Sequence, residues 1–245
     1  MSEDWISQRR DGLLFFEAAS AGPGLLVAFS GRGTAPADEP SPTAYLARRF
    51  ADALAPDGVP VVRATQVHGR RVLTVREPPG KREVSDAGEG DVLTTSLPAV
   101  ALAVQTADCV PILLAGKAAI AAAHAGWRGT VRNVAGAAVA ALAELGEEPA
   151  DIRAWLGPSI GPCCYEVGAE VADQFSSDFL WTGSSGRSFL DLAAANRAGL
   201  AAAGLSAARI ETHPSCTRCG GDQFASYRRD GTASGRMIGL ILRRH

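Results

Sequence analysis

The chain has 245 residues, 47% of them hydrophobic, which is enough to bury a core without disulfide bonds. Its formal net charge of −2 gives no general attraction to nucleic acid, so a nucleic-acid partner is disfavoured. The N-terminal residues lack the pattern of a signal peptide, and no apolar run approaches the roughly 18 residues of a membrane span. We therefore expect a cytoplasmic protein without a membrane partner.

Nine short apolar runs have the length of β-strands and lie between Gly, Pro or Asp residues, which predicts a substantial mixed sheet. In chain order they are residues 13–16, 25–29, 61–64, 72–75, 99–104, 112–114, 118–123, 152–156 and 237–242.

Three segments show helical spacing, with a cap residue or a terminating glycine: residues 43–54, 130–145 and 191–203. Asp191 is expected to cap the third of these helices. Segments 31–41, 77–90 and 182–187 are predicted as loops from their Gly, Pro and charged residues. None is long enough for a domain linker. The sequence thus predicts one α/β (mixed α+β) domain over residues 1–245, with mixed sheet layers flanked by helices.

Two of the four histidines and one of the five cysteines directly follow, or end, strand-like runs: His68, Cys109 and His124. Each alone has an ordinary interpretation, as a buried thiol or as a core or surface histidine. Together, two imidazoles and one thiolate suit zinc, and three protein ligands leave one tetrahedral position open, as in catalytic sites. The odd number of cysteines also disfavours a secreted disulfide framework and predicts reduced thiols.

Five motifs carry a family resemblance that runs in order over roughly residues 25 to 243. They are Gln66-Val-His-Gly69, Thr106-Ala-Asp-Cys109, His124-Ala-Gly-Trp-Arg-Gly-Thr130, Gly157-Pro-Ser-Ile-Gly-Pro-Cys-Cys-Tyr-Glu-Val167 and Ser226-Tyr-Arg-Arg-Asp-Gly231. In these segments the chain resembles the YfiH/laccase-domain family, whose members are also described as polyphenol oxidases and purine nucleoside phosphorylases.

The resemblance implies a compact single domain with zinc bound by His68, Cys109 and His124. It also implies phosphorolysis of adenosine, inosine, guanosine and methylthioadenosine, with adenosine deamination beside it. Phosphorolysis requires cationic groups and oriented N–H donors for phosphate. Arg128 is a candidate because it directly precedes the predicted 130–145 helix, whose N-terminus suits an anion. Arg32 resembles a family arginine, although the Gly-Gly-Val-Ser that usually follows is missing.

Deamination needs a metal-activated water and a carboxylate that moves protons. Asp108 and Glu166 are the candidate carboxylates, and either could instead orient a ligand or cap a helix. Trp127 is the stronger of two candidate aromatic residues for stacking on the purine, and Tyr165 is the other.

The remaining cysteines are discounted as metal ligands, and the role of Cys216 and Cys219 stays open. Cys163 and Cys164 are adjacent, and adjacent side chains of an extended segment point to opposite faces, which indicates structural residues. Cys216 and Cys219 have zinc-like or redox-like spacing, but no second pair or histidine follows them, so a second metal site is disfavoured.

Four further residues carry weaker expectations. His213 and His245 have no partner motif and are predicted to be surface residues. Whether Arg228 and Arg229 reach the site stays open, since an exposed basic pair is the ordinary interpretation.

Three other functions compete with the zinc phosphorylase. A multicopper oxidase needs more imidazoles than four histidines supply, although copper could replace zinc in vitro, because it binds such ligands more tightly. A cysteine hydrolase would use Cys109 as nucleophile and His124 or His68 as base. A nucleoside-sensing module without turnover is the third. The expected partners are purine nucleosides and phosphate, and the expected state is a monomer or small homo-oligomer.

Overall fold

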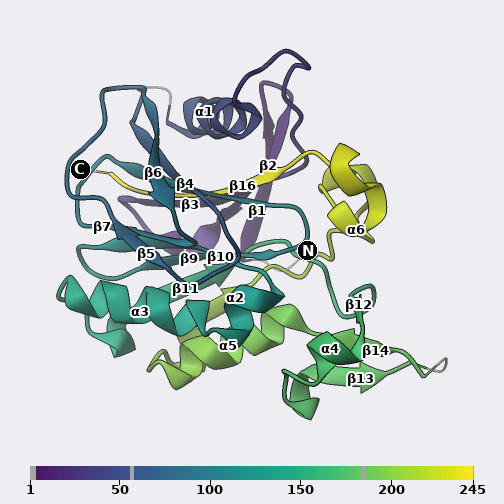
Figure 1. The fold of residues 1–245 in the computed structure, drawn as a ribbon. Coiled ribbons are helices and arrows are strands. Elements are labelled where there is room, and N and C mark those ends of the chain that lie inside the picture. Colours follow the sequence, from purple (N-terminus) through teal and green to yellow (C-terminus); the bar gives the residue numbers. More distant parts are fainter. Residues whose placement is uncertain (1–3, 56–57, 184–185, 245) are drawn as a thin grey trace.

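The structure is a computed structural model that describes residues 4–55, 58–183 and 186–244. Its largest sheet has seven strands in the order β1-β2-β3-β16-β8-β4-β6 (Figure 1). β4 runs parallel to both of its neighbours, whereas the other pairs are antiparallel, so the sheet is mixed. The strands are β1 (Trp5–Arg10), β2 (Leu13–Ala18), β3 (Leu25–Ser30), β4 (Val61–Thr65), β6 (Val84–Glu89), β8 (Ala101–Thr106) and β16 (Met237–Arg243).

A second sheet has six strands in the order β15-β11-β9-β10-β7-β5, and a third has the order β12-β14-β13. The six-stranded sheet contains β5 (Val72–Thr74), β7 (Val92–Thr95), β9 (Val110–Ala115), β10 (Ile120–Ala125), β11 (Arg153–Leu156) and β15 (Ile210–Thr212). The small sheet contains β12 (Glu166–Val167), β13 (Leu180–Thr182) and β14 (Ser188–Leu190).

The helices cover the outer faces of the two large sheets, with α1 on one side and α3 and α5 on the other (Figure 1). The α-helices are α1 (Pro42–Leu54), α2 (Trp127–Val131), α3 (Val134–Glu144), α4 (Ala169–Ala172), α5 (Leu192–Ala202) and α6 (Tyr227–Asp230). Short 3-10 helices are Ala19–Ala21, Pro149–Asp151, Ser177–Phe179, Ala207–Arg209, Gly221–Gln223 and Gly231–Ala233. In the part of the chain that the structure describes, no helix is long and apolar enough to cross a membrane.

The hydrophobic core lies in three layers. Between the two large sheets, Phe29 and Leu102 of one sheet pack with Leu113 and Trp155 of the other. One further layer joins α1 to the seven-stranded sheet, and another joins α3 and α5 to the six-stranded sheet. Since strands β8, β9 and β10 are almost wholly buried, their polar residues are restricted to the strand ends, where the site forms.

The predicted mixed α/β fold is confirmed. Each of the nine predicted strands is present, with ends shifted by at most two residues, and the predicted 43–54 and 191–203 helices correspond to α1 and α5. The Asp191 side chain accepts the backbone N–H of Ala194 at 2.8 Å, which confirms its role as a helix cap.

Two predictions of local structure were wrong. The predicted 130–145 helix is two helices, because Asn133 adopts a left-handed backbone (φ 59°) and caps α3 by accepting the N–H of Gly136. The predicted 77–90 loop contains β6, a polar strand at the edge of the sheet whose exposed residues give no apolar alternation. In the predicted 182–187 loop, Thr182 ends β13, and residues 184–185 lie outside the described residues.

The prediction of His213 as a surface residue was also wrong. Its ring is buried against Trp5, Phe16 and Phe224, with centroid distances of 5.1, 4.7 and 6.2 Å. Burial lowers the pKa of His213 to about 4, so the imidazole is neutral at physiological pH. His245 lies outside the described residues.

Candidate functional site

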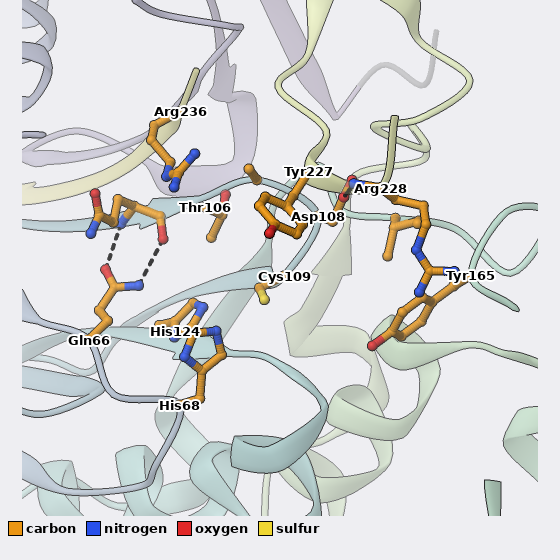
Figure 2. A pocket seen from close by; sticks show the side chains of 13 residues that line it. Gln66, His68, Thr106, Asp108, Cys109, His124, Tyr165, Tyr227, Arg228 and Arg236 are labelled. Carbon is orange, nitrogen blue, oxygen red and sulfur yellow. Dashed lines mark hydrogen bonds between the residues drawn. The ribbon is translucent and has the colours of Figure 1, made fainter. Parts of the chain in front are cut away.

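The candidate metal centre forms where three strands end close together. His68 follows β4, Cys109 lies in the connection from β8 to β9, and His124 lies near the end of β10. The ligand atoms of these three residues lie within 4.8 Å of one another, and the two imidazole rings are edge to face with centroids 4.8 Å apart. Figure 2 shows both rings and the Cys109 sulfur facing one space. The structure thus brings together the three predicted ligands.

The loop that carries His68 is bound to the end of β8 by two hydrogen bonds. Gln66 donates to the backbone carbonyl of Gln105 at 2.9 Å and accepts the backbone N–H of Gln105 at 2.9 Å (Figure 2). His68 itself has a left-handed backbone, with φ of 59°. Such a conformation is unusual for a non-glycine residue and is held only where surrounding contacts determine it.

Asp91 connects the two histidines and was missed by the sequence analysis. Its buried carboxylate lies 2.9 Å from Nδ1 of His124 and accepts the backbone N–H groups of Val67, His68 and Gly69 at 3.3, 3.0 and 2.7 Å. A carboxylate on Nδ1 fixes the ring and leaves Nε2 for a metal. The only signal in the sequence is an acid between Gly90 and the apolar β7, which is too weak to predict this role.

The site has the room and the charge that a metal ion requires. A Cβ atom at Gly126 would lie 3.0 Å from both Cys109 Sγ and His68 Cδ2, so only glycine leaves this space open. Burial raises the pKa of Cys109, but the hydrogen bonds and charges of His124 and His68 lower it to about 6. Burial likewise opposes protonation of His124, but Asp91 and Cys109 raise its pKa to about 9. When no metal is bound, these shifts favour a thiolate beside an imidazolium.

These three residues lie in a pocket of about 540 Å³ (Figure 2). That volume is within the range of about 300–1,000 Å³ that is usual for small-molecule sites. The lining contains both polar and aromatic side chains and consists of Gln66, His68, Gln105, Thr106, Ala107, Asp108, Cys109, His124, Ile160, Tyr165, Tyr227, Arg228 and Arg236.

Asp108 lines the pocket, but its carboxylate is fully engaged in holding loops together. One oxygen accepts the hydroxyl of Thr217 at 2.6 Å, and the other accepts the backbone N–H of Arg228 at 2.6 Å. Its own backbone is left-handed, with φ of 88°. Of the two roles that the sequence left open for Asp108, this geometry favours the structural one, which positions the adjacent Cys109.

The side chain of Arg228 reaches the pocket, a point that the sequence analysis left open. Its guanidinium lies 5.4 Å from the Tyr165 ring centre and donates to the carbonyl of Glu166 at 2.8 Å. Burial raises the pKa of Tyr165 to about 12, so this phenol is a neutral hydrogen-bond donor. Arg229 instead pairs with Asp230 at 2.7 Å and does not line the pocket.

Four predicted substrate-binding residues lie outside the pocket lining. Arg32 is within 3.7 and 3.5 Å of Asp222 and Asp230. The exposed Arg128 lies over the ring of Trp127, and Trp127 packs on the core under the six-stranded sheet.

Glu166 is the fourth of these residues, and its carboxylate pairs with Arg187 at 2.7 Å. The helix argument for Arg128 was also wrong, since Arg128 lies within the short α2 and the long helix begins only at Val134. The arginines that line the pocket are Arg228 and Arg236, and the sequence analysis did not single out Arg236.

The remaining four cysteines form a second group, which contradicts the expectation from the sequence. Cys163 and Cys164 lie in a turn rather than an extended segment, so both sulfurs can face the same partners. The sulfurs of Cys163, Cys164, Cys216 and Cys219 all lie within 4.8 Å of one another. The described chain thus contains two residue groups that could hold a metal ion.

Comparison with known proteins gives a consistent result. The family model described as multi-copper polyphenol oxidoreductase laccase matches residues 30–244. A purine nucleoside phosphorylase of Deinococcus radiodurans is 41% identical over 210 residues, which cover 83% of this chain and 78% of that protein. An adenosine deaminase from an unknown prokaryotic organism is 40% identical over 197 residues, which cover 75% of each chain.

The fold is also similar to that of solved structures. The crystal structure of YlmD from Geobacillus stearothermophilus has a TM-score of 0.84 and 30% identity, and the match covers 98% of this chain and 100% of YlmD. A Bacillus licheniformis protein titled YfiH has a TM-score of 0.81 and 28% identity, covering 93% and 95% of the two chains. The family model and the relatives agree, and the chain belongs to the laccase-like YfiH family.

Proposed function

We propose that this protein is a zinc-dependent purine nucleoside phosphorylase, with adenosine deamination as a side activity. The observation that carries the proposal is the meeting, in one small-molecule pocket, of the His68–Cys109–His124 donor set with Arg228 and Arg236. The names of the relatives, a phosphorylase and an adenosine deaminase, support the same substrate class. The substrates are adenosine, inosine, guanosine and methylthioadenosine, together with phosphate.

Two nitrogens and one thiolate suit zinc, because they match its preference for N and S ligands and leave a fourth position open. The Asp91 carboxylate supports this choice, since it fixes the tautomer and orientation of His124. When bound, the ion supplies Lewis-acid chemistry at the pocket floor.

In phosphorolysis, a phosphate oxygen forms a bond to C1′ of the ribose and the C1′–N9 bond breaks. The bonding electrons leave with the purine, which takes up a proton. The second product is ribose 1-phosphate, or its 5-methylthio derivative when methylthioadenosine is the substrate. We assign phosphate binding to Arg228 and Arg236, because guanidinium groups bind phosphate oxygens in a bidentate manner. Tyr165 and Tyr227 supply aromatic surface for the base, and the neutral Tyr165 phenol can donate to it.

The residues that the family resemblance suggested stay as secondary proposals. Arg32, Arg128, Trp127 and Glu166 lie outside the pocket lining, so each would need to move its side chain to touch substrate. For Asp108 we propose a positioning role, since both of its oxygens are already hydrogen-bonded.

A cysteine hydrolase is the second candidate, and one observation favours it. Without metal, the Cys109 pKa of about 6 and the His124 pKa of about 9 describe a thiolate–imidazolium pair, as in cysteine nucleophiles. Polyphenol oxidation by copper has weaker support. Among the described residues the pocket is lined by two histidines, fewer than a multicopper cluster requires.

A phosphate-dependence assay tests the proposal. Purified protein of measured zinc content is incubated with adenosine or inosine, with and without phosphate, and the products are separated by chromatography. We expect free base only when phosphate is present, and none from the Cys109→Ala variant. Inosine formed from adenosine without phosphate would make deamination the main reaction. If the zinc-loaded protein turns over neither nucleoside, the nucleoside proposal is wrong.

A further inference from the structure

The four cysteines outside the pocket lie on two loops that are far apart in sequence. Cys163 and Cys164 follow β11, and Cys216 and Cys219 follow β15, which pairs with β11 in parallel. The Cys219 sulfur is 3.5 Å from that of Cys163 and 3.2 Å from that of Cys164, and all four sulfurs lie within 4.8 Å of one another. None of these cysteines is disulfide-bonded.

The distances between the sulfurs are compatible with a tetrahedral metal site. A tetrahedral zinc ion with Zn–S bonds of about 2.3 Å separates its sulfurs by about 3.8 Å. The observed separations of 3.2 and 3.5 Å, and the limit of 4.8 Å for the group, bracket that value. Four thiolates so close together would repel one another strongly unless a cation lay between them.

A direct hydrogen bond joins the two cysteine loops at Cys216. Its sulfur accepts the backbone N–H of Gly161 at 3.2 Å. An N–H group that points at a sulfur favours the charged form of that sulfur, which is the form that binds metal. A Cβ atom at Gly161 would lie 3.1 Å from Cys216 Cβ, so glycine allows the two loops to approach this closely.

We propose that Cys163, Cys164, Cys216 and Cys219 bind a second, structural zinc ion. Four protein ligands complete the tetrahedral shell and leave no position for water or substrate, which is the mark of a structural rather than a catalytic site. The alternative is that these four cysteines form and break disulfide bonds without binding metal, and the experiment must exclude it.

The position of the four cysteines indicates which loops such an ion would hold together. Ser159 and Cys216 form a β-bridge, and the neighbouring Thr217 donates its N–H to the carbonyl of Ser159 at 2.9 Å. The Thr217 hydroxyl donates to Asp108, next to Cys109 in the pocket. The second ion therefore joins the loop that carries Ile160 and Tyr165 to the loop that anchors Asp108, and so stiffens one wall of the pocket.

Metal content tests the proposal. The full chain is purified under reducing conditions, loaded with Zn²⁺ alone, separated from free metal and measured by mass spectrometry of the elements. We expect two zinc ions per chain in the wild type, one in Cys109→Ala, and one in the double variant Cys216→Ser/Cys219→Ser. A Ser215→Ala variant, which changes the same loop without removing a sulfur, keeps two.

Cobalt identifies the ligands and does not depend on the double variant folding. Loaded with Co²⁺, the Cys109→Ala protein should show the intense sulfur-to-cobalt charge-transfer and tetrahedral ligand-field bands of a tetrathiolate complex. No metal retained by Cys109→Ala, or disulfides among the four cysteines in freshly reduced and reloaded protein, overturns the proposal. Because Cys109→Ala lacks the thiolate of the pocket site, its metal content is independent of whether the protein is a phosphorylase.

Discussion

The Asp91→Asn substitution tests how strongly a residue outside the metal ligands controls the pocket site. The two oxygens of Asp91 accept four contacts, from Nδ1 of His124 and from three consecutive N–H groups that include that of His68. Asparagine has a single oxygen, and its NH₂ group would face N–H donors. Either the His124 ring or the His68 loop therefore loses its partner.

The size of the effect follows from this geometry. Removal of a carboxylate that orients a metal-bound imidazole lowers metal affinity by about 10- to 100-fold. At 1.4 kcal/mol for each tenfold change, that corresponds to a loss of about 1.4–2.8 kcal/mol in binding free energy. We expect the fold to survive, because the substitution keeps the volume of the side chain and leaves the core between the sheets untouched.

The assay measures how free zinc protects Cys109 against iodoacetamide, by mass spectrometry of the peptide that contains Cys109. This readout reports on the pocket site alone, even when the second cysteine group binds metal. In Asp91→Asn the midpoint of protection should shift to about 10- to 100-fold higher free zinc, whereas the exposed Asp173→Asn should match the wild type. An unchanged midpoint in a correctly folded Asp91→Asn protein would refute the reasoning, and a wild type that zinc fails to protect would refute the zinc site itself.

Three further predictions follow from the same structure. In metal-free protein, alkylation of Cys109 should increase with pH around a midpoint of about 6, and His124→Gln should move that midpoint upward, since His124 lowers the pKa of the thiol. Arg236→Gln should raise the KM for phosphate about 10- to 100-fold, whereas Arg128→Gln, outside the pocket, should leave it nearly unchanged; the opposite ranking would assign phosphate to Arg128. Burial holds the pKa of His213 at about 4, below its unfolded value of 6.5, so the unfolded chain binds the extra proton. The free energy of unfolding therefore has its full value above pH 6.5 and declines by about 3 kcal/mol towards pH 4. Denaturant unfolding of the His213→Asn variant should show a smaller decline in this free energy over the same pH range.

The sequence predicted the elements that depend on local pattern. The apolar runs identify nine strands, since buried strands need continuous hydrophobic residues, and the helical spacing identifies α1 and α5. Polar edge strands such as β1 and β6 were not predicted, because solvent on one side removes the apolar pattern. The helix break at Asn133 was not predicted either, since a single left-handed residue leaves the helical spacing around it intact.

The candidate site likewise has one part that the sequence predicted and one part that only the structure shows. The motifs around His68, Cys109 and His124 sufficed to predict the donor set, because residue types at strand ends, together with the family resemblance, point to zinc. Only the structure shows that Asp91 links two of these ligands and that Arg236 lines the pocket. Both residues lie in segments without a motif of their own.

The chain itself determined the apolar runs and the cap at Asp191, and it supplied the three residues of the predicted donor set, His68, Cys109 and His124. Only the tertiary structure decided which polar groups meet. The parallel pairing of β11 and β15 brings Cys163 and Cys164 next to Cys216 and Cys219, more than 50 residues away. Contacts of this kind depend on the packing of whole sheets, where side chains distant in sequence become neighbours, and spacing along the chain carries no record of them.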